Sequence, residues 1–512
     1  MKLRTNTALF KLFQQTERAI GEKDLAHATE LTAKMLRLDR RSVEAALFRA
    51  RISGLAGEFD EVRSWMDRAI AGSPTRQKAK TALRAGDAAK DLYDRGIAEH
   101  YFRLARELEA TSGTEIALAE HLAKTRQEDE ATQIVEQLFD QGSHDPRVLL
   151  LWGRLHREAP DREARLKGLA AGQVPRIRIF ANYELAHHYD AEGDYQAAFR
   201  HLLQAKEPLQ APARNLIARR RQVRQRLVEL ARQITPEILA DWRAQELAPL
   251  RPCRGLALLA GHPRSGTTLV EQILDSHAEL VSVEESENFN YAAFVPSLKK
   301  ALRSQWIFDA LKSLKVEAVV KAREQYLASM GSYVDQPLDG KVLLDKNPSF
   351  TAILPAMLRF FPELKTVTML RDPRDVVLSC FMQAFYPPNE VTSSYLTLEE
   401  TAAEYADVMG VYAEIRDLLG QQAIEVKYED LVESPEATAR ELLDFLGLEW
   451  DPQVLEFHER SKSRVVRSPT ADAVTEKIHG RARQRWRHYE AQLEPCLEVL
   501  APHLSRWGYA GS

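Results

Sequence analysis

The chain contains only three cysteines among 512 residues, and Cys253, Cys380 and Cys496 lie far apart. An odd number of widely spaced cysteines excludes a small domain held together by disulfides, and the spacing does not match a zinc-binding pattern. We therefore expect no disulfide and no metal site. The cysteine usage indicates a reducing compartment and predicts a cytoplasmic protein.

The chain also lacks a membrane span and a strong imbalance of charge. It has no run of the about 20 apolar residues that a transmembrane helix needs. Its first residues lead into an amphipathic segment with charges at Lys11, Glu17 and Arg18, which is unlike a signal peptide. The formal net charge of −4 argues against a nucleic-acid partner. The length favours two or more domains, and the composition is that of a soluble globular protein.

The amino-terminal half contains a repeat. A small apolar residue recurs about every 34 residues, and a second set follows it by seven residues; the two sets are Ala28, Val62, Ala98, Ala131, Ala164 and Ala198, and Met35, Ala69, Ala105, Leu138, Ala171 and Ala205. Small residues two helical turns apart let paired helices pack closely. The pattern resembles five or six tetratricopeptide repeats over roughly residues 8–210 and predicts an all-α solenoid. An all-helical domain without repeats is the alternative.

An arginine-rich stretch at residues 215–230 follows the repeats. Its interleaved apolar residues favour a closing helix with a solvated arginine face over a nucleic-acid patch. Pro249 and Pro252 then break the helical pattern. We expect a helical repeat domain over residues 1–245 and a second domain over residues 246–512.

The second half begins with a glycine-bounded loop between an apolar run and a helical pattern. The run from Gly261 to Thr268 reads GHPRSGTT. Backbone N–H groups at a strand-to-helix turn point at one spot, where the helix dipole favours an anion. Nucleoside triphosphatases of the P-loop type carry a lysine in such a loop, whereas Thr267 occupies that position here. The loop is therefore predicted to bind a phosphate without transferring a γ-phosphoryl group.

Strands and helices alternate after this loop. Candidate strands are residues 255–260, 279–283, 341–344, 365–370 and 424–428. This alternation predicts an α/β domain with a parallel sheet, in which ligands bind beyond the carboxyl ends of the strands.

Polar motifs follow these strands. Arg371 and Ser379 suit a second phosphate, although an ordinary ion pair with Asp372 is the plainer interpretation. The carboxylates at 284, 285 and 287 suit either a general base or a favourably charged helix start. Lys346 could stabilise developing negative charge or simply pair with Asp345.

Together these motifs resemble the P-loop-like sulfotransferases that use 3′-phosphoadenosine-5′-phosphosulfate, PAPS. The resemblance covers about residues 254–510, and the catalytic half resembles the tyrosylprotein sulfotransferases. The joined architecture resembles bacterial sulfotransferases with a tetratricopeptide array. The resemblance implies PAPS as co-substrate, a hydroxyl or amine acceptor, and no metal.

The resemblance also implies roles for single residues. The catalytic residues would be Glu285 as general base, Lys346 and Arg264. The 5′-phosphosulfate would lie against Arg264, Ser265, Gly266, Thr267 and Thr268, and the 3′-phosphate against Arg371 and Ser379. Tyr428 matches a tyrosine near the nucleotide. The run from Thr470 to His479 and Arg485 match a loop that closes over it.

One departure concerns the acceptor. Tyrosylprotein sulfotransferases hold an acidic peptide with arginines two and six residues past the base, where this chain has Glu287 and Tyr291. This difference argues against an acidic tyrosyl peptide.

Two other functions remain open. One is a small-molecule kinase of the P-loop type, and the other is a repeat scaffold with an inactive catalytic domain. The repeat arm offers a surface either for a protein or peptide partner or for a homodimer.

Overall fold

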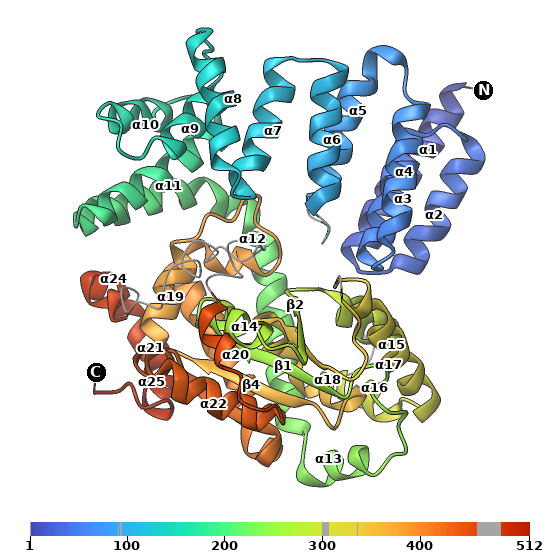
Figure 1. Ribbon diagram of the computed structural model, residues 1–512, viewed down its shortest axis with the longest axis vertical. Coiled ribbons are helices and arrows are strands. Elements are labelled where there is room, and N and C mark those ends of the chain that lie inside the picture. Colours follow the sequence, from blue (N-terminus) through green and yellow to red (C-terminus); the bar gives the residue numbers. More distant parts are fainter. Residues whose placement is uncertain are drawn as a thin grey trace. The chain divides into compact units, whose positions relative to one another are not determined.

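The computed structural model describes residues 2–90, 92, 95–298, 307–334, 336–457 and 483–511. The chain forms two compact units, and each unit contains three separate stretches of the sequence. The first comprises Met1–Arg157, Ser286–Arg303 and Glu317–Pro337, and the second comprises Glu158–Glu285, Ser304–Val316 and Leu338–Ser512. Figure 1 shows the helices of the amino-terminal part and the sheet with its surrounding helices. The predicted boundary between two domains at residue 245 rests on the sequence pattern alone and stays a prediction.

Helices are the only regular secondary structure among the described residues of the first unit. Consecutive helices pack in pairs, α1 with α2, α3 with α4, α5 with α6, and α7 with α8. The bounds are α1 (Lys2–Gly21), α2 (Leu25–Leu38), α3 (Val43–Leu55), α4 (Phe59–Gly72), η1 (Thr75–Gln77), α5 (Lys78–Ala89), α6 (Arg95–Leu108), α7 (Ser112–Lys124), α8 (Glu128–Asp140), α9 (Pro146–Leu155), η2 (Asn290–Phe294), α15 (Val295–Leu298) and α17 (Val316–Gly331).

The small residues of the predicted repeat lie in every second helix. Ala28, Val62, Ala98 and Ala131 are all buried. The fifth copy differs, because Ala164 and Ala171 are exposed. Helix α10 (Arg162–Ala170) has only nine residues and buries Leu166 instead. A helical amino-terminal region is thus confirmed, and its identification as tetratricopeptide repeats stays a prediction.

The longest helix, α12 (Tyr195–Gln233), is one continuous element of 39 residues. The repeat pattern ended near residue 210 and predicted a separate closing helix, but α12 runs through Pro208 and Pro212. A proline inside a helix removes one backbone hydrogen bond. Packing of α12 against η4 (Thr392–Leu396) and α20 (Leu398–Leu419) compensates for that loss.

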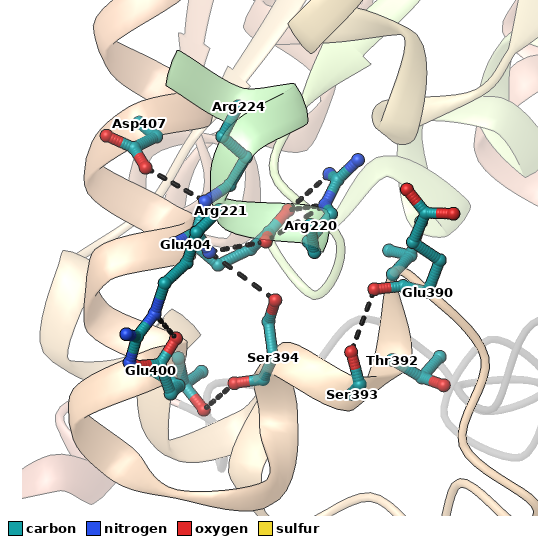
Figure 2. A network of polar contacts seen from close by, with 12 residues as sticks. Arg220, Arg221, Arg224, Glu390, Thr392, Ser393, Ser394, Glu400, Glu404 and Asp407 are labelled. Carbon is teal, nitrogen blue, oxygen red and sulfur yellow. Dashed lines mark hydrogen bonds and ion pairs between the residues drawn. The ribbon is translucent and has the colours of Figure 1, made fainter. Parts of the chain in front are cut away.

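Two arginines of α12 contradict the expected solvated face. Arg220 and Arg224 are 8% and 3% exposed, and both bind Glu404 of α20 (Figure 2). Burial by itself would raise the pKa of Glu404, but the charges and hydrogen bonds of the two arginines lower it to about 2. Arg221 remains at the surface and pairs with Glu400. The expectation was wrong for the two buried arginines because α20 brings a carboxylate to them.

The second unit contains a five-stranded parallel sheet. Its strands are β1 (Gly255–Gly261), β2 (Leu280–Glu284), β3 (Val342–Lys346), β4 (Lys365–Leu370) and β5 (Ala423–Lys427), and their order is β2-β3-β1-β4-β5. Successive side chains point to opposite faces of a strand, and nearly all residues of the first four strands are buried. Both faces of the sheet are therefore covered, as the apolar runs predicted.

Further helices of the second unit precede the sheet, connect its strands or follow its last strand. They are α11 (Pro175–Ala191), α13 (Pro236–Arg243), α14 (Thr267–Asp275), α16 (Ile307–Ser313), η3 (Pro348–Ile353), α18 (Leu354–Phe360), α19 (Pro373–Phe381), η5 (Gly420–Gln422), α21 (Tyr428–Glu433), α22 (Pro435–Leu446), η6 (Pro452–Glu456), η8 (Arg485–Tyr489), α24 (Glu490–Leu493), η9 (Glu494–Cys496) and α25 (Leu497–Arg506). Among the described residues, none of the helices combines the length and apolar character of a membrane span.

Candidate active site

Predicted site residues lie at the carboxyl ends of all five strands, at one end of the sheet. The glycine loop follows β1, Glu285 follows β2, and Lys346 is the last residue of β3. Arg371 follows β4, and Tyr428 follows β5. Because the strands are parallel, these residues share one edge.

The glycine loop adopts a conformation that its two glycines permit. Gly261 and Gly266 have φ values of 127° and 102°. A Cβ atom on Gly261 would lie 2.6 Å from the carbonyl oxygen of Met369, and one on Gly266 would lie 2.6 Å from Cδ2 of Tyr428. Both the backbone angle and the space therefore require glycine at these positions.

Three side chains hold the loop in place. Thr351 Oγ1 accepts a hydrogen bond from the Gly261 amide at 2.8 Å and donates one to its carbonyl at 2.7 Å. Arg371 Nη1 donates to the Arg264 carbonyl at 3.0 Å. Arg264 Nε in turn donates to Ser379 Oγ at 3.1 Å, which brings the loop, Arg371 and Ser379 together.

Polar groups of the loop remain available for an anion. Arg264 Nη1 and Ser265 Oγ are buried and have no hydrogen-bond partner among the described residues. Thr267 and Thr268 form the first turn of α14 and are buried. An anion at this helix start would satisfy these donors and the orphan amides of the first turn.

Lys346 and Glu285 form a direct pair on neighbouring strands. Lys346 Nζ donates to Glu285 Oε1 at 2.6 Å, and the Glu285 amide donates to the Lys346 carbonyl at 2.7 Å. The lysine side chain is fully buried, whereas the Glu285 side chain is 40% exposed. Glu285 has a φ of 49°, an uncommon value for a residue with a side chain. A buried cation thus holds a carboxylate that solvent and ligands can reach.

Two further carboxylates surround the lysine. Glu284 Oε1 lies 3.5 Å and Glu271 Oε2 lies 3.9 Å from Lys346 Nζ. Burial by itself would lower the pKa of Lys346, but the negative charges of Glu285, Glu271 and Glu284 raise it above its ordinary value. Lys346 therefore stays positively charged at physiological pH.

Arg371 connects the loop with the last strand. Its guanidinium lies 4.9 Å from the ring centroid of Tyr428, and the distance from its Nη2 to Asp375 Oδ2 is 3.7 Å. Tyr428 is buried, which raises the pKa of its hydroxyl. Arg371 is therefore oriented by an aromatic face and a carboxylate, while the Tyr428 hydroxyl stays protonated.

Positive charges gather around the loop. Burial, together with the nearby charges of Arg371 and Arg485, lowers the pKa of Arg264 to about 10, although Glu285 acts in the opposite direction. The Arg264 guanidinium is thus influenced by the positive charges of both Arg371 and Arg485. Such an arrangement favours a bound anion.

Arg485, the last of the residues predicted to bind PAPS, contacts a carboxylate of this chain. It forms an ion pair with Asp190 of α11, in the same compact unit. The predicted closing loop from Thr470 to His479 lies outside the described residues.

The two positions that departed from the tyrosylprotein pattern lie in the first unit. Glu287 forms an ion pair with Lys23 and accepts a hydrogen bond from Asn290 Nδ2 at 2.6 Å. The Lys23 ammonium lies 5.9 Å from the centroid of Tyr291. Glu287 thus already has a cationic partner within this unit.

The cysteines are all buried, and none forms a disulfide. Cys380 lies beneath the loop and donates to the Pro263 carbonyl at 3.4 Å. Burial raises the pKa of this thiol to about 12, so it stays protonated at physiological pH. Within the described ranges, no three His, Cys, Asp or Glu side chains are placed to hold a metal ion.

The sequence interpretation missed several side chains of this site. Thr351 supports the loop, Glu271 faces the lysine, and Asp375 contacts Arg371. Thr351 and Glu271 lie inside helical segments away from the strand ends, where no motif marks them. Asp375 follows Arg371 in the sequence, but its contact depends on the turn at the start of α19.

Part of the chain is similar to known proteins. Residues 257–452 match a family model described as the sulfotransferase family. An uncharacterized protein of Aquifex aeolicus is 29% identical over 337 residues, which are 64% of this chain and 42% of that protein. The chain therefore spans less than half the length of this relative. Protein-tyrosine sulfotransferase 2 of Gallus gallus is 25% identical over 267 residues, or 50% of this chain and 69% of that protein.

Solved structures show weaker similarity. The sulfotransferase domain of the Synechococcus PCC 7002 olefin synthase has 19% sequence identity and a TM-score of 0.36, and the match covers 51% of this chain and 98% of that domain. Residues 257–452 thus resemble the sulfotransferase family.

Proposed function

We propose that this protein transfers a sulfuryl group from PAPS to a hydroxyl or amine acceptor, with Glu285 as the general base. The observation that carries the proposal is the 2.6 Å contact between the accessible Glu285 carboxylate and the buried Lys346 ammonium. This pair lies at the same edge of the sheet as a loop with unsatisfied donors. A base, a fixed cation and an anion-binding loop are what such a transfer requires.

Each residue has a distinct task in this proposal. Glu285 accepts the proton of the acceptor while the bond from the acceptor atom to sulfur forms and the bond from sulfur to the phosphate oxygen breaks. Lys346 and Arg264 neutralise the negative charge that develops on the leaving phosphate. The charged neighbours of Lys346 keep it cationic, so it acts as a fixed charge rather than as a proton donor.

The donor assignment is supported by the fit of the loop to a phosphate group. Arg264 Nη1 and Ser265 Oγ are buried donors without partners among the described residues, and they adjoin the start of α14. Gly266, Thr267 and Thr268 would contribute to the same phosphosulfate subsite. Arg371, Ser379, Tyr428 and Arg485 would hold the remainder of PAPS, including its 3′-phosphate.

The acceptor is expected to differ from an acidic tyrosyl peptide. The two arginines with which tyrosylprotein sulfotransferases hold an acidic peptide are replaced by Glu287 and Tyr291 in this chain. A cytoplasmic location, and a protein or peptide partner or homodimer on the helical arm, belong to the same proposal.

The proposal is tested by transfer of labelled sulfate from PAPS to simple acceptors. The probes are 4-nitrophenol, a primary amine and a neutral tyrosyl peptide, each with the full-length protein. We expect Glu285→Gln to lower the transfer rate by about 10²–10⁴-fold, because the base is lost. The same variant should keep its affinity for 3′,5′-adenosine bisphosphate, PAP, since Glu285 serves the acceptor.

Glu279→Gln is the matched control. Glu279 is exposed at the opposite end of the sheet and pairs with Arg254, so this variant should transfer sulfate at the wild-type rate. Thermal stabilisation by ATP with Mg²⁺ but not by PAP would favour the kinase alternative. PAP binding without transfer to any probe or to molecules of a cell extract would favour the inactive scaffold.

A further inference from the structure

We infer that Asp190, on a helix of the predicted repeat arm, is a positioning residue of the donor site and acts through Arg485. The inference rests on the proposed function, because it takes the anion at the site to be PAPS. It extends that function to helix α11, which lies outside the region that resembles sulfotransferases.

Asp190 holds two side chains of η8. Its Oδ2 forms an ion pair with Arg485, and its Oδ1 accepts a hydrogen bond from the Tyr489 hydroxyl at 2.6 Å. The Asp190 side chain is 16% exposed, and that of Arg485 is 35% exposed. One oxygen of the carboxylate thus holds Arg485 and the other holds Tyr489, while part of the Arg485 side chain stays exposed.

The backbone of the same segment is held by Asp375. This buried carboxylate accepts hydrogen bonds from the amides of Gln484 and Trp486, each at 2.9 Å. The guanidinium of Arg374 lies 3.6 Å from the Trp486 ring centroid. Asp375 also lies 3.7 Å from Arg371, so it joins η8 to a predicted donor-binding arginine.

Aromatic contacts add a second link between η8 and the repeat arm. Tyr195, at the start of α12, stacks on His488 with ring centroids 4.2 Å apart. Tyr195 also meets Tyr489 edge-to-face at 5.4 Å. The loop between α11 and α12 therefore lies against η8, and Asp190 is the charged member of this contact.

The charge of Arg485 reaches the glycine loop. It contributes to the lowered pKa of Arg264, as does Arg371, so Arg264 and Arg485 repel each other. Asp190 offsets this repulsion at Arg485 and restrains a long side chain that would otherwise be free to turn away. A ligand with phosphate groups gains from an arginine that is already oriented.

The test is the affinity for PAP, measured by isothermal titration calorimetry on the full-length protein. We expect Asp190→Asn to raise the Kd for PAP by about 5–20-fold, because the ion pair that orients Arg485 is lost. Arg485→Gln should raise the Kd at least as much. The double variant should bind no more weakly than Arg485→Gln alone, since Asp190 acts through the arginine.

Glu192→Gln is the matched control, because Glu192 lies at the same end of α11, is exposed and is 3.5 Å from His188 Nε2. It should leave the Kd unchanged. If Asp190→Asn unfolds, Tyr489→Phe removes one hydrogen bond to the same carboxylate and should raise the Kd by a smaller factor.

The outcomes separate this inference from the proposed function. Wild-type affinity for PAP in folded Asp190→Asn, or an additive loss in the double variant, would overturn the role of Asp190 alone. Failure of the wild-type protein to bind PAP would overturn the donor assignment, and the inference with it.

Discussion

The two compact units use charged side chains in opposite ways. In the first unit, Arg103 bridges Glu99 and Glu130 with side chains that are 27–37% exposed. In the second unit, Arg224 and Glu404 pair with side chains that are only 3% and 1% exposed (Figure 2). Exposed pairs cost little to form and contribute little, whereas removal of one partner from a buried pair leaves an uncompensated charge.

The second unit depends on specific charged partners at positions where its charged side chains are buried. Helix packing in the first unit relies on small buried residues such as Ala98 and Ala105, which bury no polar group. Helix α12 instead joins α20 through two arginines and one glutamate, so the contact tolerates one orientation and register. Lys346 shows the same reliance on buried charge at the active site.

The largest expected effect is on stability at the buried network. Glu404→Gln should lower the free energy of unfolding of the second unit by about 3–5 kcal/mol, because two buried arginines lose their countercharge. Urea unfolding, combined with hydrogen exchange of peptides from α12 and α20, measures the loss. Arg221→Gln is the control, since Arg221 lies on the same helix with 56% of its side chain exposed. Equal losses in the two variants would contradict the comparison.

The next effect is on catalysis. Lys346→Met should lower the rate of sulfate transfer by about 10²–10³-fold, or about 3–4 kcal/mol in activation free energy, because a fixed cation is removed from the site. The measurement is transfer of labelled sulfate from PAPS to 4-nitrophenol. Lys23→Met, which breaks an exposed pair of the first unit, should keep the wild-type rate. Full activity of Lys346→Met would refute its role.

A third effect is the pH dependence of stability. The folded-state pKa of Glu404 is about 2, below the ordinary value near 4.3 that it regains on unfolding. Its contribution is therefore present above about pH 4.3 and is lost as the pH falls towards 2. The stability gap between wild type and Glu404→Gln should shrink by about 3 kcal/mol over that window. A gap that stays constant from pH 6 to pH 3 would show that Glu404 is not held as a carboxylate.

The smallest effect is expected at the exposed network of the first unit. Arg103→Gln should change the free energy of unfolding by at most about 1 kcal/mol, because its partners are solvated. The change should diminish further in 0.5 M salt, which screens exposed pairs. A loss as large as that of Glu404→Gln, measured under the same urea conditions, would remove the distinction between the units.

Much of the catalytic half could be predicted from the sequence. The five strands lie within two residues of their predicted bounds, because apolar runs flanked by polar motifs are a strong local signal. The parallel arrangement then places Glu285, Lys346 and Arg371 at one edge, since each directly follows or ends a strand. The requirement for glycine at 261 and 266 is likewise local, because it depends on backbone angles within one turn.

Other features could not be predicted, because they depend on contacts between distant residues. The solvated interpretation of Arg220 failed because its partner, Glu404, is 184 residues away. The ion pair of Asp190 with Arg485 joins residues 295 apart, and the hydrogen bonds of Thr351 to Gly261 join residues 90 apart. The sequence alone determined the strands, the loop and the order of the motifs, which follow from local patterns. Only the tertiary structure decided which charges are buried, and with which partners, because burial arises when separate elements pack together.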